Sequence, residues 1–203
     1  ITGSSQGIVY ALDDGLAEAG CDIILNGRNI EKLRKSAELV NTKQEIYQLC
    51  FDVTNYEQIK LSIDKFEKEI SPIDILINNA SAISLTGTLQ TPMKRFDLMH
   101  QINARGTYLC SQLCLSHLIK AENPHVLNIS PPLNTESHWF APHTAYTIAK
   151  FNMSLCVLGM AGEFEKEGVA FNALWPKTTI DTAAIRNYYG TCLLYTSPSP
   201  RDQ

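Results

Sequence analysis

The chain has 203 residues, of which 44% are hydrophobic and 19% are charged, and its formal net charge is −4. This length predicts one domain, and this apolar content is sufficient for a buried core, which excludes a disordered chain. No basic surface indicates a nucleic acid or an anionic membrane as a partner, and no apolar run approaches the roughly 18 residues of a membrane span. The composition therefore predicts a soluble globular protein.

The six cysteines include no Cys-x-x-Cys pair, and most lie inside apolar stretches, where a free thiol packs as a small hydrophobic group. We therefore expect reduced, structural cysteines in a reducing compartment, which is the cytoplasm or, in a eukaryote, a peroxisome or mitochondrion. The five histidines have no carboxylate or cysteine partner at ligand spacing, so the sequence predicts no metal site.

Short β-rich runs alternate along the chain with longer runs of 3.6-residue apolar period. After the stub of a first strand at Ile1, we expect strands over residues 21–26, 46–51, 73–78, 125–130 and 169–175. We expect helices over residues 8–19, 30–37, 54–70, 91–120 and 143–167. This alternation predicts an α/β fold of the Rossmann type, a doubly wound parallel sheet in three layers with its ligand crevice at the carboxyl ends of the strands.

Several helix boundaries have local signals. Gly20 and Gly168 are placed to end the first and last of these helices. Thr54 and Glu57 have the spacing of a capping box, and Thr91 before Pro92 is typical of a capped helix start with a first-turn proline.

The predicted domain covers residues 1–190 and is truncated at both ends, since most of the first strand and any seventh strand are missing from it. Residues 191–203 resemble a translated sequencing adapter more than protein, and we exclude them from the fold. A sheet without these strands exposes unpaired backbone edges, so we expect the 203 residues alone not to form a stable, active enzyme.

A glycine-containing turn, Thr2 to Ile8, lies between the strand stub and the first helix. Glycine lets the backbone approach a pyrophosphate closely, and a helix N-terminus offers free N–H groups. A glycine at such a turn is equally typical of an ordinary turn. The cofactor-binding candidates in this turn are Gly3, Ser5, Gln6, Gly7 and Ile8.

Tyr146 and Lys150 are four residues apart and therefore share one helix face. A neighbouring ammonium favours the phenolate and lowers the pKa of a tyrosine, which suits it to exchange a proton with an alcohol or carbonyl. The alternative is an ordinary surface pair.

Four separated motifs in this order resemble the short-chain dehydrogenase/reductase family, over residues 1 to about 186. They are Thr2-Gly3-x-x-x-Gly7-Ile8, Asp52-Val53, Asn78-Asn79-Ala80 and Tyr146-x-x-x-Lys150. The resemblance implies that Tyr146 is the acid/base, that Lys150 lowers its pKa and holds the nicotinamide ribose, and that Asn103 supports a proton-relay water. The further cofactor-binding residues that it implies are Asp52, Val53, Asn79, Ala80, Pro176, Ile180 and Thr182.

The chain departs from the family pattern at several positions. Val9 replaces the third glycine of the turn, Ser81 replaces the glycine after Asn-Asn-Ala, and Lys177 replaces the glycine after Pro176. Leu133 stands where the family has its substrate-orienting serine. Ser130 is the nearest upstream hydroxyl, and we take it as the candidate oxyanion donor, displaced by an insertion.

Residues 79–84, 128–134 and 174–178 resemble a hydroxysteroid dehydrogenase-like group of the family, whereas residues 1–29 are more similar to gluconate 5-dehydrogenase-type members. Together with the tail, this difference raises the alternative of a joined reading frame.

The second predicted strand ends in Gly27-Arg28. In NAD-preferring members a carboxylate at the place of Gly27 binds the ribose hydroxyls. Here position 27 has no carboxylate, and the guanidinium of Arg28 is suited to bind a 2′-phosphate. These two features predict NADP as the cofactor, with NAD as the other candidate. The alternative is that Arg28 only extends into solvent.

The function that these observations predict is an NADP-dependent oxidoreductase that transfers hydride between nicotinamide and a carbonyl or secondary alcohol. The substrate is expected to be a small molecule, lipid- or steroid-like or a sugar acid, and the full-length form is expected to be a homo-oligomer. The alternatives are a catalytically silent NADP-binding relative and a non-functional fragment.

Overall fold

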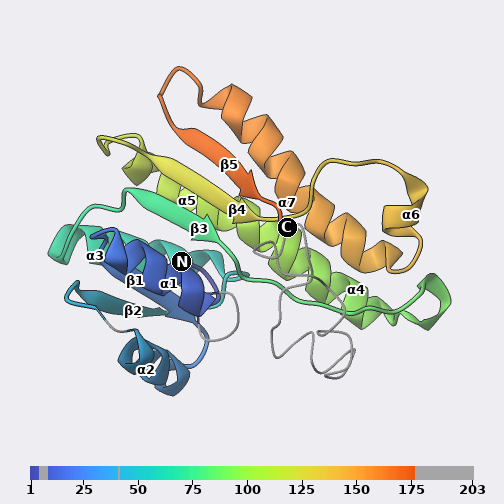
Figure 1. Cartoon of the computed structure of the whole chain (residues 1–203), viewed down its shortest axis with the longest axis horizontal. Coiled ribbons are helices and arrows are strands. Elements are labelled where there is room, and N and C mark those ends of the chain that lie inside the picture. Colours follow the sequence, from blue (N-terminus) through green and yellow to red (C-terminus); the bar gives the residue numbers. More distant parts are fainter. Residues whose placement is uncertain (5–8, 41, 177–203) are drawn as a thin grey trace, which may run out of the picture.

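The computed structural model describes residues 1–4, 9–40 and 42–176 (Figure 1). The strands are β1 (Ile23–Gly27), β2 (Ile46–Cys50), β3 (Ile75–Asn78), β4 (His125–Ile129) and β5 (Ala170–Leu174). The α-helices are α1 (Val9–Glu18), α2 (Ile30–Leu39), α3 (Tyr56–Glu69), α4 (Met93–Met99), α5 (Thr107–Leu118), α6 (Ser137–Phe140) and α7 (Thr144–Glu163). A 3₁₀ turn covers Thr88–Gln90, and a π-helix covers His100–Gly106. None of the helices in these ranges is long and apolar enough to cross a membrane.

All strand pairings are parallel, and they form a pair β1–β2 and a triplet β3–β4–β5. Ile1 and Thr2 join these two parts. The Ile1 carbonyl accepts a hydrogen bond from the Asn26 N–H (3.2 Å), and the Thr2 N–H donates to the Ile77 carbonyl (2.9 Å). The prediction of an α/β fold with a parallel sheet is confirmed, and residues 1–2 lie between β1 and β3.

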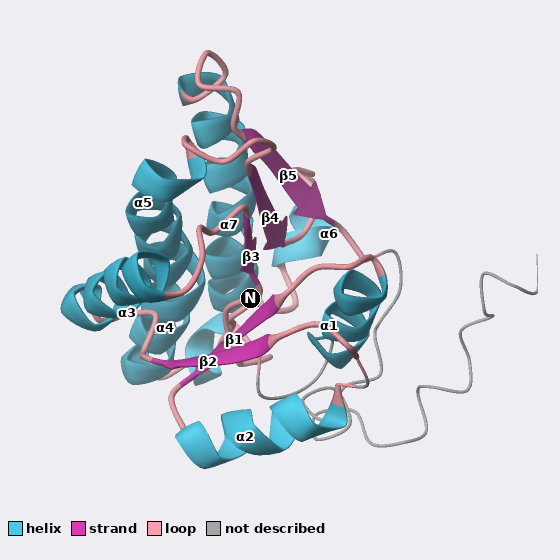
Figure 2. Ribbon diagram, turned by 90° about the vertical axis from the view of Figure 1, so that its left-hand side faces the viewer, coloured by secondary structure: helices cyan, strands magenta, loops and turns pink. Residues whose placement is uncertain are grey.

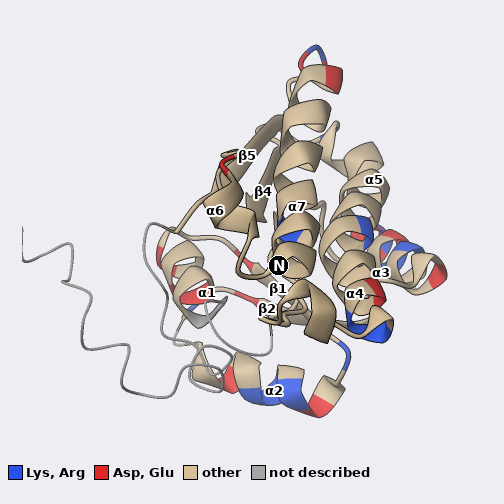
Figure 3. Ribbon diagram, turned by 90° about the vertical axis from the view of Figure 1, so that its right-hand side faces the viewer, with Lys and Arg blue, Asp and Glu red and all other residues tan. Residues whose placement is uncertain are grey.

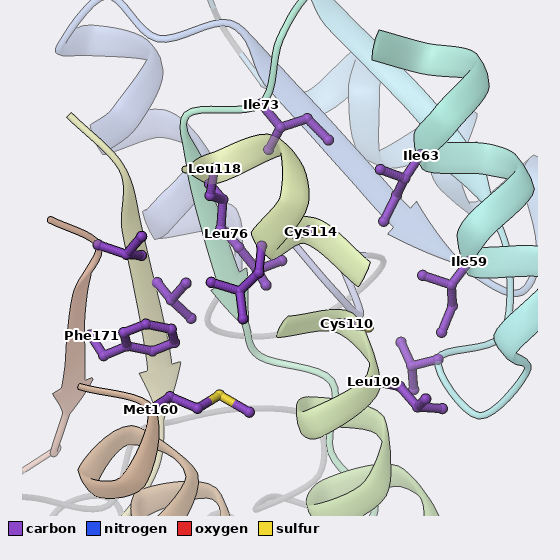
Figure 4. Packing of buried hydrophobic residues seen from close by; sticks show 14 of the residues in the cluster. Ile59, Ile63, Ile73, Leu76, Leu109, Cys110, Cys114, Leu118, Met160 and Phe171 are labelled. Carbon is purple, nitrogen blue, oxygen red and sulfur yellow. The ribbon is translucent and has the colours of Figure 1, made fainter. Parts of the chain in front are cut away.

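Helices lie on both faces of this sheet. Figure 2 shows α3, α4, α5 and α7 on one side of the strands, and α1 and α2 on the other. The main core lies on the first side (Figure 4), where Ile59, Leu118 and Val126 have no exposed surface. A second cluster, around Leu25 and Leu33, fills the space between β1, α1 and α2. This arrangement leaves the carboxyl ends of the five strands at one edge of the sheet.

The predicted helix ends agree with the structure at Gly20 and differ from it at Gly168 and at two caps. Gly20 (φ +93°) has the left-handed conformation that terminates α1. Gly168 also has a positive φ (+72°), but α7 ends earlier, at Glu163 with Phe164 as its C-cap, so the predicted helix end at Gly168 is wrong. Asn55, not Thr54, caps α3, because the Thr54 hydroxyl donates instead to Asp52 (2.8 Å), so the predicted capping box is wrong. Thr91 is also not a cap, since its hydroxyl donates to the Gly87 carbonyl (2.8 Å).

The single helix predicted over residues 91–120 is in fact divided. It runs as α4, then as the π-helix His100–Gly106, and then as α5. A π-helix inside an α-helix is rare and is found mostly at functional sites. Here it contains Asn103, one of the predicted site residues.

The cysteines of the described ranges are all free. Cys110 and Cys114 lie in the main core, where burial raises the pKa of both thiols, that of Cys114 to about 12. Cys50 is exposed, unlike most of the others.

Candidate active site

The glycine turn packs directly against the segment that follows β3. Gly3 has φ +67°, and a Cβ atom at this position would lie 2.8 Å from the Cα of Ala80. The Thr2 hydroxyl oxygen accepts hydrogen bonds from the backbone N–H groups of Asn79 (3.0 Å) and Ala80 (3.1 Å). Glycine is therefore required at position 3 by both conformation and space. The predicted residues Ser5, Gln6, Gly7 and Ile8 lie outside the described ranges.

Asn26, which was not predicted, ties this turn to the ends of β1 and β2. Its side-chain oxygen accepts from the Gly3 N–H (3.3 Å), and its amide nitrogen donates to the carbonyls of Leu49 (3.0 Å) and Phe51 (3.1 Å). A polar residue in the apolar run before Gly27 is the sequence signal that could have identified it.

Arg28 and Asp52 follow β1 and β2 at the same edge of the sheet. The Arg28 Nη1 lies 3.8 Å from the Asp52 Oδ2, and the Arg28 side chain is 69% exposed. Such a long, exposed ion pair contributes little stability, so the guanidinium is available to another anion. Asp52 also orders the next turn by accepting from the Thr54 N–H (2.9 Å). Figure 3 shows that many charged residues lie on α2 and α3, whereas α7 carries very few.

Val53, in the turn after β2, packs against Gly106 of the π-helix. A Cβ atom at Gly106, the last residue of the π-helix, would lie 3.0 Å from the Val53 Cγ2. The neighbouring Arg105 Nη1 donates to the Thr54 carbonyl (2.6 Å). The turn after β2 is thereby held against the helix that carries Asn103.

Tyr146 and Lys150 lie one turn apart on α7, and α7 packs against the π-helix and α4. Tyr146 is half-buried and packs against the small cluster of Met99, Ala145 and Ala149. The Lys150 Nζ donates to the Ile129 carbonyl at the end of β4 (2.7 Å) and lies 3.3 Å from the Met153 Sδ. Burial of this ammonium lowers the pKa of Lys150 to about 8.

Asn103 is fully buried and uses both ends of its amide on one residue. Its oxygen accepts from the Ala82 N–H (2.7 Å), and its nitrogen donates to the Ala82 carbonyl (3.0 Å). The π-helix is thus fastened to the segment after β3 at Ala82, which packs against the same cluster as Tyr146.

Ser130 immediately follows β4 and is only 2% exposed. Its hydroxyl oxygen lies 2.9 Å from that of Ser154, and its N–H donates to the Leu174 carbonyl (3.3 Å). Pro176 lies two residues after β5 and is exposed. The predicted Ile180 and Thr182 lie outside the described ranges.

The structure thus brings most described candidates to the edge of the sheet where the strands end, or to the helices that pack beside it. This edge is where doubly wound sheets bind nucleotides. Among the described residues, no group of three His, Cys, Asp or Glu side chains could hold a metal ion.

A sequence model of the family described as short chain dehydrogenase matches residues 1–189. The chain belongs to this family. It is 49% identical over 193 residues to the hydroxysteroid dehydrogenase-like protein 2 of Danio rerio, a match that covers 91% of this chain and 46% of that protein. The same relative therefore matches both the first third and the second half, and the chain spans about half the length of the curated relatives it matches.

Two solved structures resemble the fold. A candidate dehydrogenase from Xanthomonas campestris is 43% identical, with a TM-score of 0.86, and the match covers 94% of this chain and 73% of that one. A metagenomic short-chain oxidoreductase in complex with NADP is 24% identical, with a TM-score of 0.79, over 88% of this chain and 81% of that one. The latter resembles this chain in fold alone.

Proposed function

We propose that the protein is an NADP-dependent oxidoreductase that transfers hydride between nicotinamide and a carbonyl or secondary alcohol. The observation that carries this proposal is the placement of Tyr146 and Lys150 on one face of α7, with the Lys150 ammonium buried at the end of β4. A buried cation one turn from a phenol favours the phenolate and brings proton exchange closer to neutral pH.

In this proposal Tyr146 donates a proton to the substrate oxygen during reduction and accepts it during oxidation. Lys150 stabilises the phenolate and contacts the ribose of the bound cofactor. Asn103 holds the segment after β3 through Ala82 and supports the proton relay that restores the Tyr146 proton. Ser130 is the substrate-orienting hydroxyl.

The residues present fit a dinucleotide. Because Gly3 has no Cβ atom, its backbone lies close to the backbone of Ala80. A pyrophosphate approaches the chain at this place in this fold. Asp52, Val53, Asn79 and Ala80 line the same edge of the sheet, and Pro176 follows β5 at that edge. When bound, the nicotinamide supplies or accepts the hydride, and the protein supplies the placement and the proton.

The preference for NADP over NAD rests on Gly27 and Arg28. Gly27 brings no carboxylate to repel a 2′-phosphate, and within the described ranges the exposed Arg28 side chain forms a long ion pair with Asp52 alone. Its planar fork can bind a phosphate through two parallel hydrogen bonds.

A catalytically silent NADP-binding relative is the second candidate. It is favoured by the burial of Ser130, whose hydroxyl is paired with Ser154 rather than open to solvent. Turnover and binding assays distinguish the two, because a silent relative would bind NADPH and oxidise none of it.

For the substrate we propose a small carbonyl or alcohol, lipid- or steroid-like or a sugar acid, and for the full-length form a homo-oligomer. The lipid- or steroid-like class is supported by the similarity to hydroxysteroid dehydrogenase-like protein 2. The free cysteines of the described ranges fit a reducing compartment such as the cytoplasm.

The test of the function is a steady-state assay of the purified full-length protein with NADPH and a panel of ketones and aldehydes from these classes, together with NADPH binding by fluorescence. We expect NADPH oxidation with at least one class and a lower KM for NADPH than for NADH. Binding without any turnover would favour the silent relative, and absence of binding would refute the proposal.

A further inference from the structure

Four consecutive residues at the end of β4 each make a polar contact with one turn of α7. The Asn128 amide nitrogen donates to the Met153 carbonyl (3.0 Å), and the Ile129 carbonyl accepts from the Lys150 Nζ (2.7 Å). The Ser130 hydroxyl lies 2.9 Å from that of Ser154, and the Pro131 carbonyl accepts from Ser154 (2.5 Å). We refer to residues 128–131 and 150–154 as the β4–α7 clamp.

The position of the Ser154 proton follows from its two neighbours. The Pro131 carbonyl can only accept, and two oxygen atoms 2.5 Å apart require a proton between them. Ser154 has a single hydroxyl proton, and its hydroxyl donates both toward the Pro131 carbonyl and toward the Ser130 oxygen (2.9 Å). Ser154 thereby fixes both the rotamer of Ser130 and the path of the backbone at Pro131.

The same contacts reach Lys150. The Ile129 carbonyl, which accepts the hydrogen bond from Lys150, lies between Asn128 and Ser130 in the chain. Both of these residues form hydrogen bonds with α7. Any shift of the 130–131 backbone therefore moves the acceptor of the Lys150 ammonium. Because Ser130 and Ser154 are each 2% exposed, water does not readily replace a lost partner.

We propose that Ser154 is a positioning residue for the reaction, which holds the Ser130 hydroxyl and the Ile129 carbonyl in register with the turn of α7 that carries Lys150. This assignment rests on the proposed oxidoreductase function. Ser154 acts through Ser130 and Ile129 and touches neither the substrate nor the cofactor.

The variants that test this role are Ser154→Val and Ser154→Thr, which have the same shape and differ only in the hydroxyl. Ser154→Ala, which adds no atoms, replaces Ser154→Val should the larger side chain prevent folding. Ser36→Ala is the matched control, because Ser36 is also a buried helix serine that donates to a carbonyl (Lys32, 2.9 Å), but it lies on α2, away from the clamp.

The experiment measures kcat, KM and NADPH affinity in the full-length protein, together with thermal unfolding. For Ser154→Val we expect kcat to fall about tenfold, the size of one hydrogen bond, while NADPH affinity stays within about twofold. Ser154→Thr is expected to recover most of the lost kcat. Ser36→Ala is expected to lower the melting temperature and leave kcat unchanged, which separates positioning from general stability.

The same substitution is then made in a Ser130→Ala background. If Ser154 acts through Ser130, Ser154→Val lowers kcat there much less than in the wild-type background. A folded Ser154→Val variant with wild-type kcat would overturn the proposal, and so would fully additive losses in the double variant. A wild-type protein that binds NADPH and turns over no carbonyl identifies failure of the proposed function itself, and the role of Ser154 fails with it.

Discussion

Gly3→Ala tests why the glycine turn has a glycine at position 3. At φ +67° an alanine costs about 1–2 kcal/mol, because its Cβ crowds the following carbonyl oxygen. The new Cβ would also lie 2.8 Å from the Ala80 Cα, a backbone atom that can move only together with the segment after β3. Overpacking of this kind costs about a further 1–3 kcal/mol. Alanine also reduces the conformational entropy of the unfolded chain, which offsets up to about 1 kcal/mol of these costs. We therefore expect the free energy of unfolding to fall by about 2–4 kcal/mol.

The measurement is urea-induced unfolding followed by circular dichroism, with NADPH affinity measured in parallel. Gly15→Ala is the matched control, because Gly15 lies in the exposed interior of α1 and a Cβ there has no neighbour within 4 Å. Alanine at this helical position is expected to stabilise the protein by about 0.5–1 kcal/mol. If Gly3→Ala were as stable as the wild type and bound NADPH equally well, the close approach of Gly3 to Ala80 would not matter as argued.

Three further substitutions test the charges of the site and the core. Arg28→Ala is expected to lower kcat/KM for NADPH by about 10- to 100-fold, the effect of a lost charge-assisted hydrogen bond, and to leave NADH unchanged; equal losses with both cofactors would contradict the assignment. Burial lowers the pKa of Lys150 to about 8 in the folded chain, so the unfolded chain binds more protons above that pH, and stability gains from Lys150 as pH rises from about 8 to 10.5. Unfolding free energies of wild type and Lys150→Met across this range should therefore differ most at the lower end, and a constant difference would refute the argument. Burial raises the pKa of Asp13 to about 7, and neither carboxylate oxygen has a hydrogen-bond partner among the described residues, so its contribution to stability falls as pH rises from about 4 through 7. Asp13→Ala should stabilise the protein more at pH 8 than at pH 5, and the reverse order would contradict this.

Much of the fold follows from local sequence rules. Gly20 ends its helix because few other residues adopt a positive φ. The motif residues after β1, β2 and β3 gather because the carboxyl ends of parallel strands meet at one edge of a sheet.

Other features depend on contacts that sequence patterns do not encode. Thr54 and Asn55 are both competent helix caps, and the choice between them is made by Asp52, which binds the Thr54 hydroxyl. The π-helix around Asn103 has no distinctive sequence, since it differs from an α-helix only in which carbonyl accepts each N–H.

Ser154 shows the same limit within the candidate site. A serine in a helix interior is usually interpreted as a solvent-facing polar residue. Its actual partners, Ser130 and Pro131, are distant in sequence and reach it only after β4 packs beside α7.

The central claim is that Tyr146 transfers the proton, and Tyr146→Phe tests it most directly. The substitution removes only the phenolic oxygen and its proton, so the packing of the ring against the cluster of Met99, Ala145 and Ala149 is preserved. We predict that NADPH affinity stays within about twofold while turnover falls by about 10²- to 10⁴-fold, the usual contribution of a positioned acid/base. Near-wild-type turnover in a folded Tyr146→Phe protein that binds NADPH would show that another group transfers the proton.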